Sequence, residues 1–143
     1  MIKKIALEEH MSLPETLDDA RGFVGGTADW PAFERQILDV GELRLELMDK
    51  NGIEFTLVSL NAPAVQAIVD VKKAIDVAKR ANDFLAECVA RHPKRFAGFA
   101  ALPMQDPQAA AAELTRCVKQ LGFKGALVNG FTQAVVADSV IYY

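Results

Sequence analysis

The sequence predicts an α/β fold in which parallel strands alternate with helices, and three observations lead to this prediction. Short apolar runs, typical of buried strands, alternate with longer segments whose apolar residues recur every three or four positions. Proline, glycine and asparagine separate these segments. The 143 residues, 51% of them hydrophobic, provide enough apolar material for a core. We therefore expect a single domain over residues 1–143.

The first predicted strand covers residues 5–10 and ends in two carboxylates and an imidazole. Side chains alternate along an extended strand, so Ala6, Glu8 and His10 are predicted on one face and Glu9 on the other. Glu8 and His10 would lie about 6.5 Å apart along the strand, close enough for both to bind one divalent ion. A strand that simply ends in solvent explains the same pattern equally well.

A long loop is predicted over residues 11–31, which contain several prolines and glycines. Connections in α/β units usually have about 2 to 6 residues, and longer loops are often functional. Phe23 and Trp30 lie in this segment, where an aromatic side chain could close over a bound ring. Either ring could instead attach the loop to the body of the protein.

Amphipathic helices are predicted in three segments. The first covers residues 33–50, and the second and third begin at the N-cap residues Asp70 and Asp106. Cys88 and Cys117 fall on the apolar faces of the second and third helices, without the spacing of metal ligands. We expect both cysteines to be reduced thiols in the core.

Further strands are predicted over residues 55–60, 96–102 and 125–128. Asn61 and Asn129 directly follow the first and the last of these strands. Proteins with parallel α/β sheets place ligand contacts at the carboxyl ends of strands, although asparagine is also an ordinary turn residue. Both asparagines are therefore candidate pocket residues.

Alternating strands and helices imply a parallel sheet with right-handed crossovers. A doubly wound nucleotide-binding sheet would carry a glycine-rich turn after the first strand, where this chain has Glu8, Glu9, His10 and Met11. A (β/α)8 barrel suits a polar strand end, but it typically needs about 250 residues. The predicted segments make half of one. We therefore expect the amino-terminal half of a (β/α)8 TIM barrel, truncated at its carboxyl end.

Composition argues against several kinds of partner. The net charge is -3, and the sequence contains no basic stripe of the kind that binds nucleic acid. It contains neither a signal peptide nor an apolar run of about 20 residues that could span a membrane. These features predict a cytoplasmic protein that binds neither nucleic acid nor membrane.

Six motifs together carry a family resemblance: LEEH (residues 7–10), SLNAPAVQA (59–67), RAND (80–83), HPKRF (92–96), ALPMQDP (101–107) and GFKGALVNG (122–130). In combination they resemble the amino-terminal half of the amidohydrolase-superfamily aromatic acid decarboxylases. Within that family the chain is most similar to the γ-resorcylate (2,6-dihydroxybenzoate) decarboxylases. The resemblance extends over residues 5–143.

The resemblance implies a metal-dependent (β/α)8 barrel in which Glu8 and His10 bind Mn²⁺ or Zn²⁺. Phe23, Asn61 and Asn129 would contact a small aromatic carboxylate substrate. In the family, a histidine of the fifth strand and an aspartate of the eighth strand complete the metal site, and a further histidine of the sixth strand lies near the reacting carbon. No catalytic residue is therefore assigned in this chain, and the general acid is expected beyond Tyr143. The family also implies a homo-oligomer, namely a tetramer.

The expected activity of the full-length parent is non-oxidative decarboxylation of a hydroxybenzoate such as 2,6-dihydroxybenzoate, which in reverse is carboxylation of a phenol. The 143-residue chain alone is expected to be inactive. One alternative is a metal-dependent hydrolase or hydratase of a small carboxylate. Another is a non-catalytic half-barrel that self-associates or binds a partner through its open sheet edges.

Overall fold

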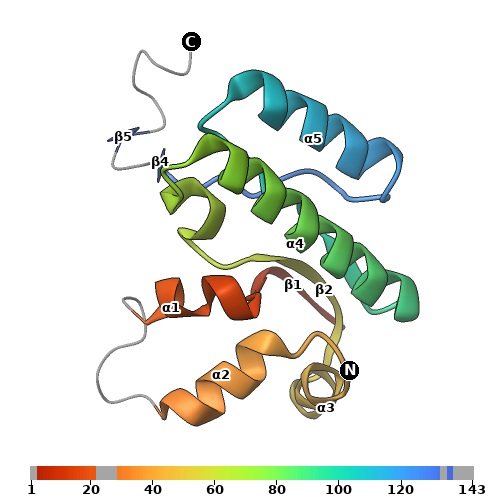
Figure 1. Cartoon of the computed structure of the whole chain (residues 1–143). Helices are drawn as coiled ribbons and strands as arrows, with labels where there is room; N and C mark the ends of the chain where they lie inside the picture. Colours follow the sequence, from red (N-terminus) through yellow and green to blue (C-terminus); the bar gives the residue numbers. More distant parts are fainter. Residues whose placement is uncertain (1–2, 22–28, 133–134, 137–143) are drawn as a thin grey trace.

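A parallel sheet of three strands forms the centre of the structure, a computed structural model that describes residues 3–21, 29–132 and 135–136 (Figure 1). The strands lie in the order β1 (Lys4–Met11), β2 (Ile53–Leu60) and β3 (Phe96–Gly98). The other elements are η1 (Pro14–Thr16), α1 (Leu17–Ala20), α2 (Trp30–Leu38), α3 (Glu42–Asn51), η2 (Ala64–Ala67), α4 (Val71–Arg91), α5 (Pro107–Lys119) and an antiparallel pair, β4 (Phe131–Thr132) and β5 (Val135–Val136). The predicted α/β class with parallel strands is confirmed.

The main core lies between β2 and the helices on either side of it in the chain, α3 and α4. Val58 and Leu60 of β2 are buried and pack in one cluster with Met48 of α3 and Val77 and Leu85 of α4. By contrast, Ile5 and Leu7 of β1 are 62% and 65% exposed. Helices therefore cover one face of the sheet, while apolar side chains of β1 remain open to solvent. No helix in the described part of the chain is long and apolar enough to cross a membrane.

The predicted single helix over residues 33–50 is wrong, because the structure has two helices there. α2 ends at Leu38 and α3 begins at Glu42. The carboxylate of Asp39, between the two helices, accepts hydrogen bonds from the N–H groups of Gly41 (3.0 Å) and Arg44 (2.9 Å). Periodicity alone misses this break because the spacing of apolar residues continues across it. The sequence signal for it is Asp39, whose short carboxylate bonds the backbone at the start of α3.

The loop predicted over residues 11–31 also contains structure. It includes η1 and α1, and α2 begins at Trp30, where Asp29 is the N-cap and accepts from the N–H of Ala32 at 3.3 Å. Trp30 packs on Phe33 with ring centroids 5.6 Å apart, and the Arg21 guanidinium lies 4.4 Å from its ring. Trp30 therefore attaches the start of α2 to the end of α1. Residues 22–28, including Phe23, lie outside the described part.

The predicted starts of α4 and α5 are confirmed. The Asp70 carboxylate accepts from the N–H of Lys73 at 2.8 Å, and Asp106 accepts from two N–H groups at 3.0 Å. Cys88 and Cys117 are free and buried, also as predicted. Burial raises the pKa of the Cys117 thiol to about 12, so it stays protonated at neutral pH.

The strand predicted over residues 96–102 ends early, at Gly98, because a side chain replaces the neighbouring strand. The Asn82 amide donates to the carbonyl of Ala101 and accepts from its N–H, both at 2.9 Å. The predicted strand over residues 125–128 is present only as a single parallel bridge between Ala126 and Ala100. It nevertheless lies beside β3 in the predicted direction. The parallel segments thus follow one another in chain order across the sheet, with less regular ladders than predicted.

Close packing requires glycine at position 98. A Cβ atom on Gly98 would lie 2.7 Å from the ring of Phe123, which is 3% exposed. Phe123 follows α5 and is held by hydrogen bonds on either side of it, including Lys124 N–H to the Gly98 carbonyl at 3.0 Å. The missing side chain therefore lets the segment after α5 lie directly against β3.

Asn82 also joins α4 to α5 through a buried carboxylate. It donates to Glu113 at 2.8 Å, and Arg116 donates to both oxygens of Glu113 at 2.7 and 2.9 Å. Burial alone would raise the pKa of Glu113. The hydrogen bonds from Arg116 and Asn82 outweigh burial and lower the pKa below its ordinary value.

We expect Glu113 to make the protein sensitive to acid. Because the folded-state pKa is lowered, its contribution to the free energy of unfolding is complete above the ordinary carboxyl value of about 4.3 and is lost as the pH falls through the folded-state pKa. Urea unfolding at pH 7 and pH 3.5 should show a smaller loss of stability in Glu113→Gln than in the wild type, by about 1 kcal/mol. The exposed Glu87→Gln on α4 is the control, and it should follow the wild type. Equal losses in all three proteins would contradict the assignment.

Candidate metal centre

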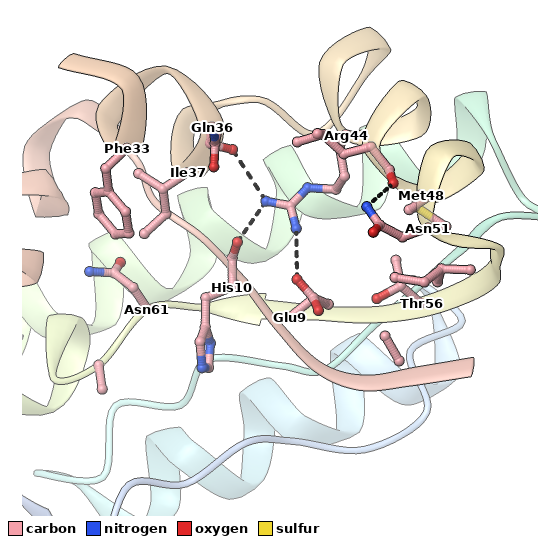
Figure 2. Close-up of a pocket in the computed structure, with 14 residues that line it drawn as sticks. Glu9, His10, Phe33, Gln36, Ile37, Arg44, Met48, Asn51, Thr56 and Asn61 are labelled. Carbon is pink, nitrogen blue, oxygen red and sulfur yellow. Dashed lines mark hydrogen bonds and ion pairs between the residues drawn. The ribbon is translucent and has the colours of Figure 1, made fainter. Parts of the chain in front are cut away.

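Glu8 and His10 lie at the carboxyl end of β1, where their side chains come together. The Nε2 atom of His10 is 3.8 Å from Oε1 of Glu8, with the two side chains 35% and 72% exposed. Figure 2 shows the His10 ring on one side of β1 and the Glu9 carboxylate on the other. The structure therefore places Glu8 and His10 on one face, as alternation predicts.

Ala6 does not lie on that face, so its prediction is wrong. Along β1 the step from Ala6 to Glu9 pairs with the shorter step from Thr56 to Val58 on β2, so β1 carries an extra residue there. An extra residue reverses the alternation of side chains. Ala6 consequently shares the Glu9 face, and both residues line a cavity of about 610 Å³ on that side.

The orientation of the His10 ring is fixed from β2. Its Nδ1 atom lies 3.1 Å from the hydroxyl oxygen of Ser59, which is 2% exposed and pairs with His10 in the sheet. When the Nδ1–H donates to Ser59, the lone pair of Nε2 faces Glu8. When the serine hydroxyl donates instead, the proton is on Nε2. Only the first tautomer can bind a metal through Nε2.

Arg44 of α3 contacts the same strand end from the opposite side. Its Nη2 donates to the His10 carbonyl at 2.7 Å, and its Nη1 lies 3.7 Å from the Glu9 carboxylate (Figure 2). The side chain is 11% exposed, and burial lowers the pKa of the guanidinium from its ordinary value, while Glu9 and Asp39 oppose that shift. The sequence analysis missed Arg44. Its signal was a charge four residues from two buried apolar positions, Val40 and Met48.

The two candidate asparagines are held by different neighbours, and Asn61 lines the same cavity as His10. Asn61 is 5% exposed, and its side chain points toward Phe33 in Figure 2, with Nδ2 3.4 Å from the Thr16 carbonyl. Gln66 holds the main chain of Asn129, since its Oε1 accepts from the Asn129 N–H at 2.8 Å. Both side-chain roles stay predictions, as does that of Phe23.

Glu8 and His10 fit part of a metal site. Two ligands at the usual zinc distances would have their N and O atoms about 3.4 Å apart in a tetrahedral site. The observed 3.8 Å is a few tenths of an ångström wider, which a small side-chain rotation would close. Within the described residues, no group of three or more His, Cys, Asp or Glu side chains could hold a metal ion. The pair therefore needs further ligands.

Comparison with known proteins agrees with this fold. The profile of a family described as amidohydrolase matches residues 16–141. The chain belongs to the amidohydrolase family. It is 58% identical over 143 residues to the γ-resorcylate decarboxylase of Rhodococcus jostii (strain RHA1), covering 98% of this chain and 43% of that protein. The γ-resorcylate decarboxylase of Rhizobium radiobacter is 59% identical over 140 residues.

Solved structures of amidohydrolase relatives superpose closely. A dihydroxybenzoic acid decarboxylase from Polaromonas sp. JS666, with bound manganese and the inhibitor 2-nitroresorcinol, gives a TM-score of 0.91 at 58% identity and covers 99% of this chain and 44% of that chain. A 2,6-dihydroxybenzoate decarboxylase in complex with 2,6-dihydroxybenzoate gives 0.92 at 55% identity, with 99% and 45% covered. This chain matches the amino-terminal part of those TIM barrels and spans less than half of their length.

We expect Ser59 to determine the tautomer of His10 before any metal binds. In metal-free protein labelled with ¹⁵N, the ring nitrogen shifts of wild-type His10 at pH 8 should show one predominant tautomer. In Ser59→Ala the Nδ1 atom loses its partner, so the shifts should move toward an even mixture of the two tautomers. Thr56→Ser, on the other face of β2, serves as control. Identical His10 shifts in Ser59→Ala would mean that Ser59 does not select the tautomer.

Proposed function

We propose that this chain forms the amino-terminal half of a metal-dependent decarboxylase that releases CO2 from a dihydroxybenzoate such as 2,6-dihydroxybenzoate. In reverse, the same enzyme would carboxylate a phenol. The observation that carries the proposal is the convergence of Glu8 and His10, 3.8 Å apart, at the carboxyl end of β1. Barrel enzymes place their chemistry at that end of the strands. The 58% identity to γ-resorcylate decarboxylase supports the choice of substrate class.

In this proposal Glu8 and His10 bind one divalent ion, Mn²⁺ or Zn²⁺. Manganese in the Polaromonas structure supports the first choice. When bound, the ion supplies Lewis-acid chemistry and a template for the carboxylate and ortho-hydroxyl oxygens of the substrate. The Glu8 carboxylate contributes a negative charge that offsets part of the ionic charge. His10 contributes a neutral nitrogen, held in orientation by Ser59.

The substrate contacts are proposed for Phe23, Asn61 and Asn129. Phe23 would lie against the aromatic ring, and the two asparagines would line the pocket from the ends of their strands. Decarboxylation then needs a proton on the ring carbon that bears the carboxylate, and loss of CO2 restores aromaticity. We place the acid that delivers this proton beyond Tyr143, in the part of the protein that this chain does not contain. The enzyme is proposed to be a cytoplasmic homotetramer.

The test uses the complete protein with Mn²⁺. It should deplete the ultraviolet absorption of 2,6-dihydroxybenzoate, and Glu8→Gln should lower kcat by roughly 1000-fold, because Lewis-acid stabilisation of several kcal/mol is lost with the ion. Glu9→Gln is the matched control, since it removes the adjacent carboxylate from the opposite face and should lower kcat less than about threefold. Unchanged turnover in Glu8→Gln would remove Glu8 from the site.

One relative keeps a second chemistry open. The chain is 36% identical over 100 residues to a 2-keto-4-carboxy-3-hexenedioate hydratase of Sphingobium sp. (strain NBRC 103272 / SYK-6), so the same metal pair could serve hydration or hydrolysis of a small carboxylate. Product analysis separates these reactions, because only decarboxylation forms CO2 in proportion to substrate consumed.

The third alternative is a non-catalytic half-barrel that self-associates or binds a partner. Its support is the exposure of Ile5 and Leu7 on β1, which is an edge strand of the sheet among the described residues. Size-exclusion chromatography of the 143-residue chain tests this alternative. A monomer at micromolar concentration would count against it.

A further inference from the structure

The pairing of β1 with β2 is irregular next to the proposed metal ligands. Between Ala6 and Glu9 the pairing of β1 with β2 shifts register, and Glu8 lies within that interval. A bulge of this kind leaves a residue without its usual ladder hydrogen bonds. The strand that carries both ligands therefore needs support from another element to hold their geometry.

Arg44 supplies such support from α3. Its guanidinium donates through Nη2 to the His10 carbonyl at 2.7 Å and through Nε to the Asp39 carbonyl at 2.9 Å. Its Nη1 faces the Glu9 carboxylate at 3.7 Å. Because the guanidinium is planar and its donors are fixed relative to one another, these contacts couple the end of β1 to the turn before α3.

We propose that Arg44 is a positioning residue, which fixes the main chain of His10 so that Glu8 and His10 are preorganised to bind the divalent ion. This rests on the proposed function, because it takes the pair to be metal ligands. Arg44 itself does not reach the ion, since it lies on the Glu9 face of β1 and the ring of His10 points away from it (Figure 2). Groups that orient metal ligands typically change metal affinity 10- to 100-fold when they are removed.

Arg95 is the matched control. It also donates to main-chain carbonyls of the sheet, those of Glu54 at 3.0 Å and Ile53 at 3.2 Å, and it pairs with Asp49 at 2.6 Å. These carbonyls belong to the start of β2, at the opposite end of the sheet from His10. Loss of Arg95 should therefore cost stability without disturbing the ligand pair.

The experiment measures Mn²⁺ dissociation constants by calorimetry and Tm in the complete, metal-stripped protein. Arg44→Met should weaken Mn²⁺ binding at least tenfold. Arg44→Lys should give an intermediate loss, because its donors all lie on one nitrogen and lack the fixed spacing of the guanidinium Nε and Nη2. Arg95→Met should lower Tm and leave the dissociation constant within about twofold of the wild type. Should Arg44→Met fail to fold, Arg44→Lys carries the test.

Each outcome decides the role of Arg44. Wild-type affinity in both Arg44 variants, or equal weakening in Arg95→Met, would make Arg44 a structural residue only and would leave the proposed function intact. A wild-type protein that binds no Mn²⁺ would overturn both the metal site and the role of Arg44. A wild-type protein that binds Mn²⁺ but forms no CO2 would overturn decarboxylation alone.

Discussion

The parallel pairing of β1 with β2 is the constraint on which the candidate site depends. Parallel partners point to the same face, so the register decides which of the polar residues at the end of β1 face the helices and which face away from them. Glu8 and His10 lie together on one face, and Glu9 faces Arg44 on the other. The extra residue between Ala6 and Glu9 sets these faces relative to the start of β1. Without it, Glu8 and His10 would still share a face, but that face would be the one that carries Ala6.

Both the side chain and the main chain of His10 are held by neighbouring residues. Ser59 of β2 contacts its imidazole, and Arg44 of α3 contacts its carbonyl. Within the part of the chain that the structure describes, no helix restrains Glu8 in this way, and its side chain is 72% exposed. This combination suits the binding of an ion. The fixed imidazole defines where the ion binds, and the carboxylate can rotate to meet it.

Sequence patterns predicted the fold class and the caps well because those features depend on local chemistry. Asp70 and Asp106 cap their helices through contacts within three residues of their own positions. The prediction of a single helix over residues 33–50 failed at Asp39. There the carboxylate bonds the backbone of the following helix, although the spacing of apolar residues continues across the break. The predicted end of β3 was wrong for a different reason. Asn82, which bonds the backbone at Ala101, is 19 residues away from it in the sequence.

The candidate site was predictable only in part, because some of its contacts are local in sequence and others are not. Glu8 and His10 are close in sequence, so alternation brings them together. The bulge that moves Ala6 depends on how β2 aligns, and Arg44 reaches His10 across 34 residues of chain. Spacing along a single strand contains no information about either. Long-range contacts of this kind become visible only when the helix and the strand are placed in space.

The approach of Phe123 to Gly98 has a consequence for engineering this scaffold. The aromatic ring occupies the volume that any side chain at position 98 would need, and both residues are enclosed by the core. A combinatorial library that diversifies either position separately would consist mostly of clones with a steric overlap or a void. Productive variants would have to exchange volume between the two positions together, with a smaller residue at 123 matched to an alanine at 98.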